Sequence, residues 1–155
     1  MRFQITALEA ERFEPFFAMS DQELADNLAV RVTATSSPGF PCRVSLADAE
    51  VGDELILVNH EHQPGASPYQ AAHTVYVRKG VRQARPAVGE IPEQLRTRLL
   101  SLRAFDDQAM IVGADLIDGE KLGTALEALL ADPATAYVHI HYAKYGCYAA
   151  RADRA

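Results

Sequence analysis

The sequence is poor in cysteine, lacks tryptophan and contains no long apolar run. Its two cysteines, Cys42 and Cys147, are far apart and form no CxxC pair, which excludes the common zinc-ribbon and thioredoxin-type patterns. No stretch approaches the roughly 18 apolar residues of a membrane span. The N-terminal segment 1–17 carries regularly spaced acidic residues and lacks the apolar core of a signal peptide. We therefore expect a cytoplasmic protein in which both cysteines are thiols.

Motifs that identify large nucleotide-binding and hydrolase families are also missing. The sequence contains no GxGxxG, GxxxxGK(S/T), GxSxG, SxxK or EF-hand pattern. These absences disfavour nucleotide hydrolysis by a P-loop and α/β-hydrolase chemistry. The histidine spacings match neither the HExxH zinc peptidases nor the zinc deaminases. The sequence thus indicates no reaction and leaves open whether the protein is an enzyme.

Acidic residues outnumber basic ones, with 21 Asp and Glu against 15 Lys and Arg, and the net charge is −6. This balance argues against nucleic acid or an anionic membrane as a partner. Basic residues concentrate between positions 78 and 103, where only Glu90 and Glu93 are acidic. These basic residues attract a small anionic ligand or the acidic first half of the chain. The alternative is that they form an ordinary solvated surface.

Length and composition indicate one globular domain spanning residues 1–155. The chain is 48% apolar and 23% charged, and a domain of this size buries about two thirds of its unfolded surface without disulfides. Because strands and helices do not alternate regularly, we expect an α+β fold with a mixed or mostly antiparallel sheet and about three helices on one side. We expect strands at 2–6, 29–35, 54–59, 74–78, 109–116, 136–142 and 147–151, helices at 20–27, 90–100 and 118–130, and either a strand or a helix end at 101–105.

The five histidines fall into three places: His60 with His62, His73 alone, and His139 with His141. Residues two apart in a strand project from one face, about 6.6 Å apart along the chain, so the imidazoles of a pair can converge on one ion. Imidazole suits zinc, copper, iron or nickel. We therefore regard His60, His62, His139 and His141 as candidate ligands of a transition metal. The alternatives are structural or exposed histidines, and general acid–base catalysis.

The first histidine pair lies where a strand is expected to end. Residues 61–68 contain two prolines and a glycine and predict a loop, which would take His62 out of the strand. Four converging histidines are therefore not expected.

Cys147 follows the second histidine pair across an expected hairpin. There its thiol and the imidazole of His141 could form a nucleophilic pair, which makes Cys147 the candidate catalytic residue. The alternative for Cys147 and for Cys42 is burial as a small hydrophobic residue.

Three arginines, Arg43, Arg78 and Arg151, flank apolar stretches. If they converge, with Tyr76 and Cys42 beside them, their planar guanidinium groups would grip a carboxylate or phosphate in two-point fashion. We regard these five residues as candidates for binding an anionic small molecule. The alternative is that the arginines form ion pairs with acidic residues of the first half.

Four segments together resemble a known family: PGFPCRVSL at 38–46, NHEHQPGASPY at 59–69, HTVYVR at 73–78 and HIHYAKYGCYAAR at 139–151. In this order and spacing they are similar to a bacterial family of short single-domain proteins classified only as a domain of unknown function, number twelve hundred and three of that series. FPCR and GCYAAR are its most specific parts. The resemblance covers nearly the whole chain and implies one unit without an assigned activity; it carries no catalytic or binding residues.

Two hypotheses follow from these observations. In the first, the 60–62 segment, the FPCR loop and the 139–147 hairpin meet and bind a metal ion or a small anionic ligand. In the second, the chain is a non-catalytic interaction or structural protein, for example a homodimer formed through a sheet edge, and its histidines are incidental.

Overall fold

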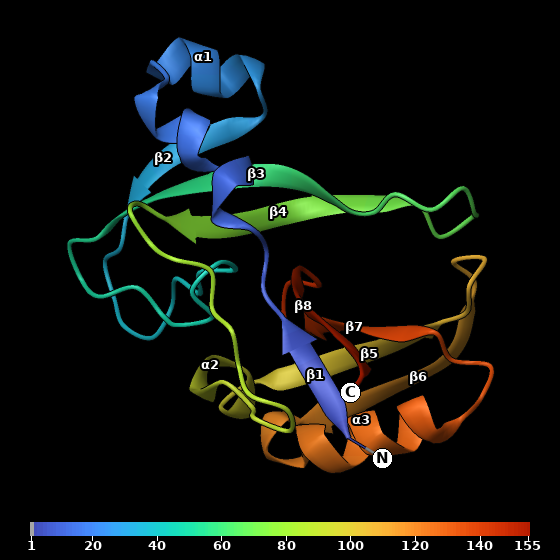
Figure 1. Cartoon of the computed structure of the whole chain (residues 1–155). Helices are drawn as coiled ribbons and strands as arrows, with labels where there is room; N and C mark the ends of the chain where they lie inside the picture. The colour runs from blue at the N-terminus through green and yellow to red at the C-terminus, as the bar shows by residue number, and fades with distance from the viewer. Residues whose placement is uncertain (1) are drawn as a thin grey trace.

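Alternating apolar and polar residues build a five-stranded antiparallel sheet, here called the large sheet. The computed structural model describes residues 2–155. In it the strands of the large sheet follow the order β1-β8-β7-β5-β6 (Figure 1). Each is paired antiparallel with its neighbour. The strands are β1 (Phe3–Thr6), β5 (Leu99–Phe105), β6 (Ile111–Asp118), β7 (Tyr137–Tyr142) and β8 (Tyr148–Arg154).

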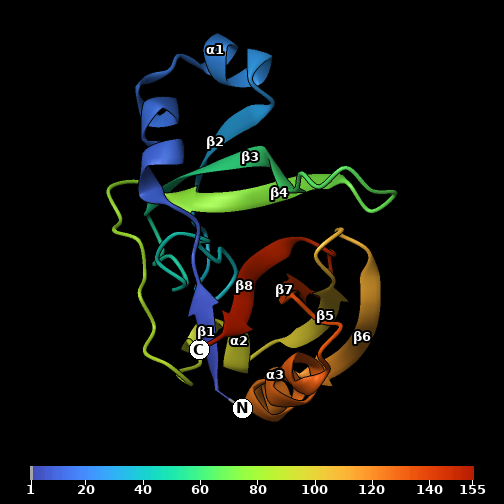
Figure 2. The same cartoon turned by 45° about the vertical axis from the view of Figure 1, so that its right-hand side comes forward.

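One face of the large sheet is apolar and is covered by helix α3 (Leu122–Ala131), as Figure 2 shows. Leu122, Leu126 and Leu130 recur at helical spacing and are fully buried. They belong to one cluster with Ile140 of β7. Fully burying each such side chain contributes about 1.5–3 kcal/mol. The cluster therefore decides which residues of each strand face α3 and which face away.

The small sheet has the order β2-β3-β4 and is also antiparallel. Val58, Val75 and Val77 form a second apolar cluster with Phe13 and Leu24 of the N-terminal segment. In this segment the Ser20 hydroxyl accepts the Glu23 N–H at 3.1 Å, which confirms the predicted helix cap. The elements are η1 (Ala10–Arg12), η2 (Glu14–Ala18), α1 (Asp21–Asp26), β2 (Ala29–Thr33), β3 (Glu54–Gln63) and β4 (Ala71–Arg78).

The β3–β4 hairpin crosses the face of the large sheet that is turned away from α3 (Figures 1 and 2). Near the end of β3, the Gln63 side chain donates a hydrogen bond to the Tyr137 hydroxyl at 2.9 Å. In the loop after β3, the Ser67 hydroxyl donates to the Ala109 carbonyl at 2.7 Å. These bonds attach the hairpin to the large sheet, and the functional candidates lie between the two.

The predicted α+β fold with mostly antiparallel pairing is confirmed, and the strands divide between two sheets. Two sheets form because β3 pairs with β2 and β4 rather than with a strand of the large sheet, and the valines of β3 and β4 pack against the N-terminal helices. β3 also runs to Gln63, past the predicted end, because β4 pairs with it over that length. The predicted loop therefore begins at Pro64, and both His60 and His62 lie in the strand.

Two predicted helices are shorter than expected. The helix over 90–100 is reduced to α2 (Glu93–Arg96), because residues from Leu99 onward pair with β6 and β7 as strand β5. Asp118 does not cap α3, because it pairs in β6; the turn η3 (Gly119–Lys121) intervenes. Within residues 2–155, no helix combines the length and apolar character needed to cross a membrane.

Candidate metal centre

His139 and His141 lie on the face of the large sheet that is turned away from α3. Val138 and Ile140 enter the apolar core, so strand alternation turns the two histidines to the opposite face. The β3–β4 hairpin covers this face. As a result the exposed fraction of His139 is 4% and that of His141 is 0%.

His62 reaches the same place from the small sheet. The β3–β4 pairing shifts register between Glu61 and Gln63, which leaves His62 as the extra residue of a β-bulge. A bulge bends its strand and can re-aim a side chain. The His62 ring stacks on Tyr148 of β8, with 5.5 Å between centroids and 12° between planes. A second register shift, between β7 and β8, sets Tyr148 opposite His141.

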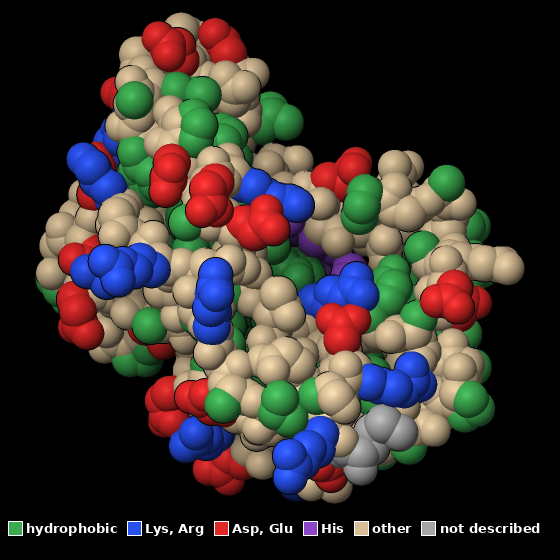
Figure 3. Space-filling model, in the orientation of Figure 1, with side chains coloured by type: hydrophobic (Ala, Val, Ile, Leu, Met, Phe, Trp, Pro, Cys, Tyr) green, Lys and Arg blue, Asp and Glu red, His purple; other side chains and the backbone are tan. Residues whose placement is uncertain are grey.

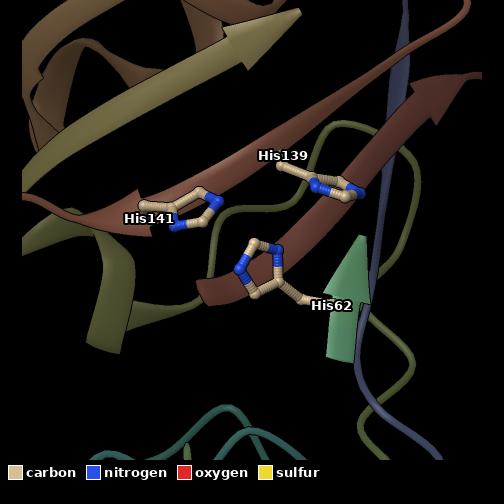
Figure 4. Close-up of side chains that lie close together, drawn as sticks. All are labelled: His62, His139 and His141. Atoms are coloured by element: carbon tan, nitrogen blue, oxygen red, sulfur yellow. The ribbon is translucent and has the colours of Figure 1, made fainter. Parts of the chain in front are cut away.

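The three imidazoles face one another (Figure 4). One ring nitrogen from each of His62, His139 and His141 lies within 4.8 Å of the other two. The ring centroids of His62 and His141 are 4.9 Å apart, and those of His62 and His139 are 6.0 Å apart. Strands from both sheets therefore contribute to one cluster, here called the histidine triad.

Each histidine of the triad has a buried ring nitrogen without a hydrogen-bond partner among residues 2–155: Nδ1 of His62, Nδ1 of His139 and Nε2 of His141. The other nitrogen of His141, Nδ1, lies 2.9 Å from the Gly146 carbonyl. A carbonyl only accepts, so Nδ1 carries the proton and Nε2 presents its lone pair to the triad. Leaving a buried polar atom unpaired costs about 1–3 kcal/mol. A bound ion would remove that cost.

Burial holds the triad in the neutral form that binds metal. Desolvation lowers the pKa of His62 to about 4, with a smaller contribution from the charge of Arg103. Desolvation likewise lowers the pKa of His139 to about 3, assisted by the neighbouring histidines. It also lowers the pKa of His141 to about 3, although the bond to Gly146 acts in the opposite direction. At neutral pH all three rings therefore offer lone pairs rather than protons.

Aromatic rings line the triad. Tyr148 lies edge-on to His139 and His141, with centroid distances of 5.2 and 5.8 Å. The ring centroids of Phe105 and His139 are 5.0 Å apart. Among the described residues, the group whose side chains could hold a metal ion consists of these three histidines, without Asp, Glu or Cys. Figure 3 shows histidine side chains at the bottom of a hollow between the two sheets, with Lys or Arg side chains at its rim. Within the triad His62 is only half-buried, so solvent reaches the triad at His62.

His60 and His73 are adjacent to the triad but not part of it. They face each other across β3 and β4. The His60 ring packs edge-on against Phe13 at 5.8 Å and lies 6.3 Å from Tyr148. Nδ1 of His73 accepts the N–H of Thr74 at 2.9 Å. Of the four histidines predicted as candidate ligands, the structure therefore brings together three.

The two cysteines are buried and separate from the triad. Cys147 is 7% exposed and lies beside the guanidinium of Arg43. The Sγ atom of Cys42 accepts the N–H groups of Ser45 and Arg78 at 3.4 and 3.3 Å. The Nδ1 atom of His141 contacts the Gly146 carbonyl, and among residues 2–155 no hydrogen bond joins His141 to the Cys147 thiol.

The candidate anion-binding arginines have three different sets of partners. Arg43 is 2% exposed and donates to the carbonyls of Pro41 and Tyr148 at 2.6 and 2.8 Å. Arg78 pairs with Asp53 at 2.9 Å, and Arg151 pairs with Asp153 at 2.6 Å. Tyr76 packs against Phe40, with 5.2 Å between ring centroids. Among residues 2–155 each of these three arginines thus has its own partner, and no hydrogen bond or ion pair joins them to a common group.

Two residues beside the triad were not selected from the sequence. Tyr148 lies within ring contact of all three histidines, and Arg103 of β5 pairs in register with His139 of β7. The alternation of Leu100, Leu102 and Ala104 with polar residues was the signal that could have placed Arg103 on the histidine face. It was missed because segment 101–105 was compatible with a helix end.

Comparison with known proteins gives a family but no function. The family model described as "Protein of unknown function (DUF1203)" matches residues 39–154, a range that includes the whole histidine triad. No curated protein and no solved structure gives a significant match. The match covers well over half of the chain and agrees with the resemblance seen in the FPCR and GCYAAR segments. This chain belongs to the DUF1203 family of proteins of unknown function.

Proposed function

We propose that the protein binds a divalent transition-metal ion through His62, His139 and His141. The observation that carries this proposal is the set of three buried ring nitrogens that lack partners and face one another. Isolated buried histidines are normally hydrogen-bonded, because each unpaired nitrogen is costly. A single bound ion would give all three nitrogens a partner and remove the free-energy cost of leaving each one unpaired.

The surrounding bonds favour metal binding over a purely structural role. In metal sites a ligating histidine commonly donates its other ring N–H to a carbonyl, which fixes the tautomer and the ring orientation. The bond from His141 Nδ1 to the Gly146 carbonyl has this arrangement. Tyr148 holds His62 by stacking, and the β-bulge aims it. These contacts preorganise the nitrogens in the absence of an ion.

Zinc is the first ion to test. Tetrahedral coordination at the usual zinc–nitrogen distance of about 2.0–2.1 Å separates the ligand nitrogens by about 3.3 Å. The three nitrogens lie within 4.8 Å of one another, so ring rotations that move them by about an ångström would complete the geometry. Three protein ligands leave a further coordination position for water or a substrate, as in catalytic rather than structural zinc sites.

The test measures metal binding by untagged protein stripped with chelator. Isothermal titration with Zn²⁺ should give one site in the wild type and lose that site in His139→Ala, His141→Ala and His62→Ala. The matched controls are His60→Ala and His73→Ala, which remove neighbouring histidines of β3 and β4 and should retain the site. Circular dichroism of each variant verifies folding. A wild type that binds no zinc, nickel, cobalt or copper contradicts the proposal, as does equal loss of binding in the His60 and His73 variants.

A further inference from the structure

Arg103 is a cation beside the histidine triad, and among residues 2–155 no acidic side chain forms an ion pair with it. In the antiparallel register of β5 and β7, Arg103 lies directly opposite His139, and both are on the face turned away from α3. Residues paired in this way have Cβ atoms about 4.5–5.5 Å apart. The positive charge of Arg103 helps to lower the pKa of His62 and His141 after desolvation as the main cause, and it is the smallest of the causes at His139. The strand register therefore places Arg103 beside the triad, and its charge acts on all three rings.

Two other arginines, Arg151 and Arg98, have carboxylate partners. Arg151 is also paired in register with His139, but Asp153 binds it through three contacts of 2.6–3.0 Å and it stacks over the Tyr137 ring. Arg98 makes a two-point contact with Asp48 at 2.6 and 3.0 Å. Within residues 2–155, Arg103 makes no side-chain hydrogen bond or ion pair. Its pKa is lowered by desolvation alone, without a carboxylate that opposes the shift.

The charge balance of the site therefore selects the ligand. Three neutral imidazoles, a divalent ion and the guanidinium of Arg103 carry three positive charges, and no carboxylate belongs to the cluster. Arg151, whose charge also lowers the pKa of His139, is paired with Asp153, whereas Arg103 has no such partner among residues 2–155. An anion at the open coordination position would offset this charge. A carboxylate has the matching form, since one oxygen can bind the metal while the other accepts from the planar guanidinium.

The walls of the site favour a small ligand. Phe105 and Tyr148 lie 5.0 and 5.2 Å from the His139 ring, and Tyr137 also lies 5.2 Å from it. These aromatic rings make the surroundings of the triad apolar. They offer few hydrogen-bond donors to a large polyanion such as a nucleotide. The hollow of Figure 3 provides access from solvent, with basic side chains at its rim.

We propose that the triad-bound metal and Arg103 together hold the carboxylate group of a small organic ligand. This inference rests on the proposed metal site and adds the chemical class of its substrate or ligand. It gives Arg103 a specific task, which is to bind the second carboxylate oxygen.

The test uses full-length protein loaded with Co²⁺, whose visible absorption reports changes in coordination. Acetate is titrated as the carboxylate probe, with sulfate as a tetrahedral oxyanion for comparison. The wild type should show a saturable spectral change with acetate. Arg103→Gln should weaken acetate binding at least tenfold, because a charge-assisted two-point contact is lost. Arg103→Lys, which keeps the charge without the fork, should give an intermediate affinity.

The control is the double variant Arg151→Gln/Asp153→Asn, which removes a neutral ion pair from the same face and should change acetate affinity less than about twofold. Co²⁺ stoichiometry and circular dichroism are measured for every variant. If Co²⁺ binds and acetate affinity is equal in wild type and Arg103→Gln, the carboxylate proposal is overturned while the metal site stands. The same holds if acetate causes no change or if only sulfate binds. A wild type that binds no Co²⁺ overturns both proposals.

Discussion

The buried triad predicts that the metal-free protein loses stability in mild acid. The pKa of His139 and of His141 is about 3 in the folded protein, well below the value near 6.5 in an unfolded chain. Below pH 6.5 the unfolded state therefore binds more protons than the folded state. Linkage then requires that stability falls as the pH decreases from about 6.5 towards 3.

The magnitude follows from the size of these shifts. At pH 5 the pH lies about 1.5 units below the pKa of an unfolded histidine, which is therefore protonated, while the buried rings remain neutral. Each of His139 and His141 then lowers the free energy of unfolding by about 2 kcal/mol relative to pH 7. The pair together costs about 4 kcal/mol. Small domains are stable by about 5–15 kcal/mol, so this loss is readily measured.

The assay is urea unfolding of metal-free protein at pH 7 and pH 5, followed by far-ultraviolet circular dichroism. His139→Leu/His141→Leu lacks the two groups, keeps the burial and should lose about 4 kcal/mol less than the wild type over this interval. All carboxylates are the same in both proteins, so their titration cancels in the comparison. An equal loss in the two proteins would refute the assignment of neutral, desolvated rings.

Further predictions concern the wall of the site, the core and the cysteines. Tyr148→Ala should weaken Zn²⁺ binding about tenfold, because His62 loses its stacking partner, whereas Tyr148→Phe should not; titration calorimetry compares them. Leu126→Ala should lower the free energy of unfolding by about 2–5 kcal/mol in urea, because its fully buried side chain leaves a cavity beneath the large sheet; a loss below 1 kcal/mol would contradict this packing. Cys147 should react with iodoacetamide more slowly in folded protein than after unfolding in urea, since it is 7% exposed.

The local parts of the fold are accessible from sequence because local patterns determine them. Alternation in the strand of residues 137–142 assigns Val138 and Ile140 to the core and both histidines to the other face, as found. The leucines of α3 give its buried side by helical spacing. Ser20 marks the start of α1 by capping chemistry.

The composition of the triad depends on tertiary contacts that no local pattern encodes. His60 and His62 have the same residue type and strand parity, yet only His62 meets His139 and His141. The difference comes from the bulge in β3 and from the way the hairpin crosses the large sheet, which leaves His60 against Phe13. Sequence periodicity also gives no information on how two sheets are placed relative to each other.

The most direct test of the central claim is the location of the ion itself. Crystals grown with one equivalent of Zn²⁺ would be measured on both sides of the zinc absorption edge. We predict a single anomalous peak between the rings of His62, His139 and His141, about 2.0–2.1 Å from one nitrogen of each. A peak elsewhere, for example between His60 and His73, or crystals with no ordered zinc, would contradict the account.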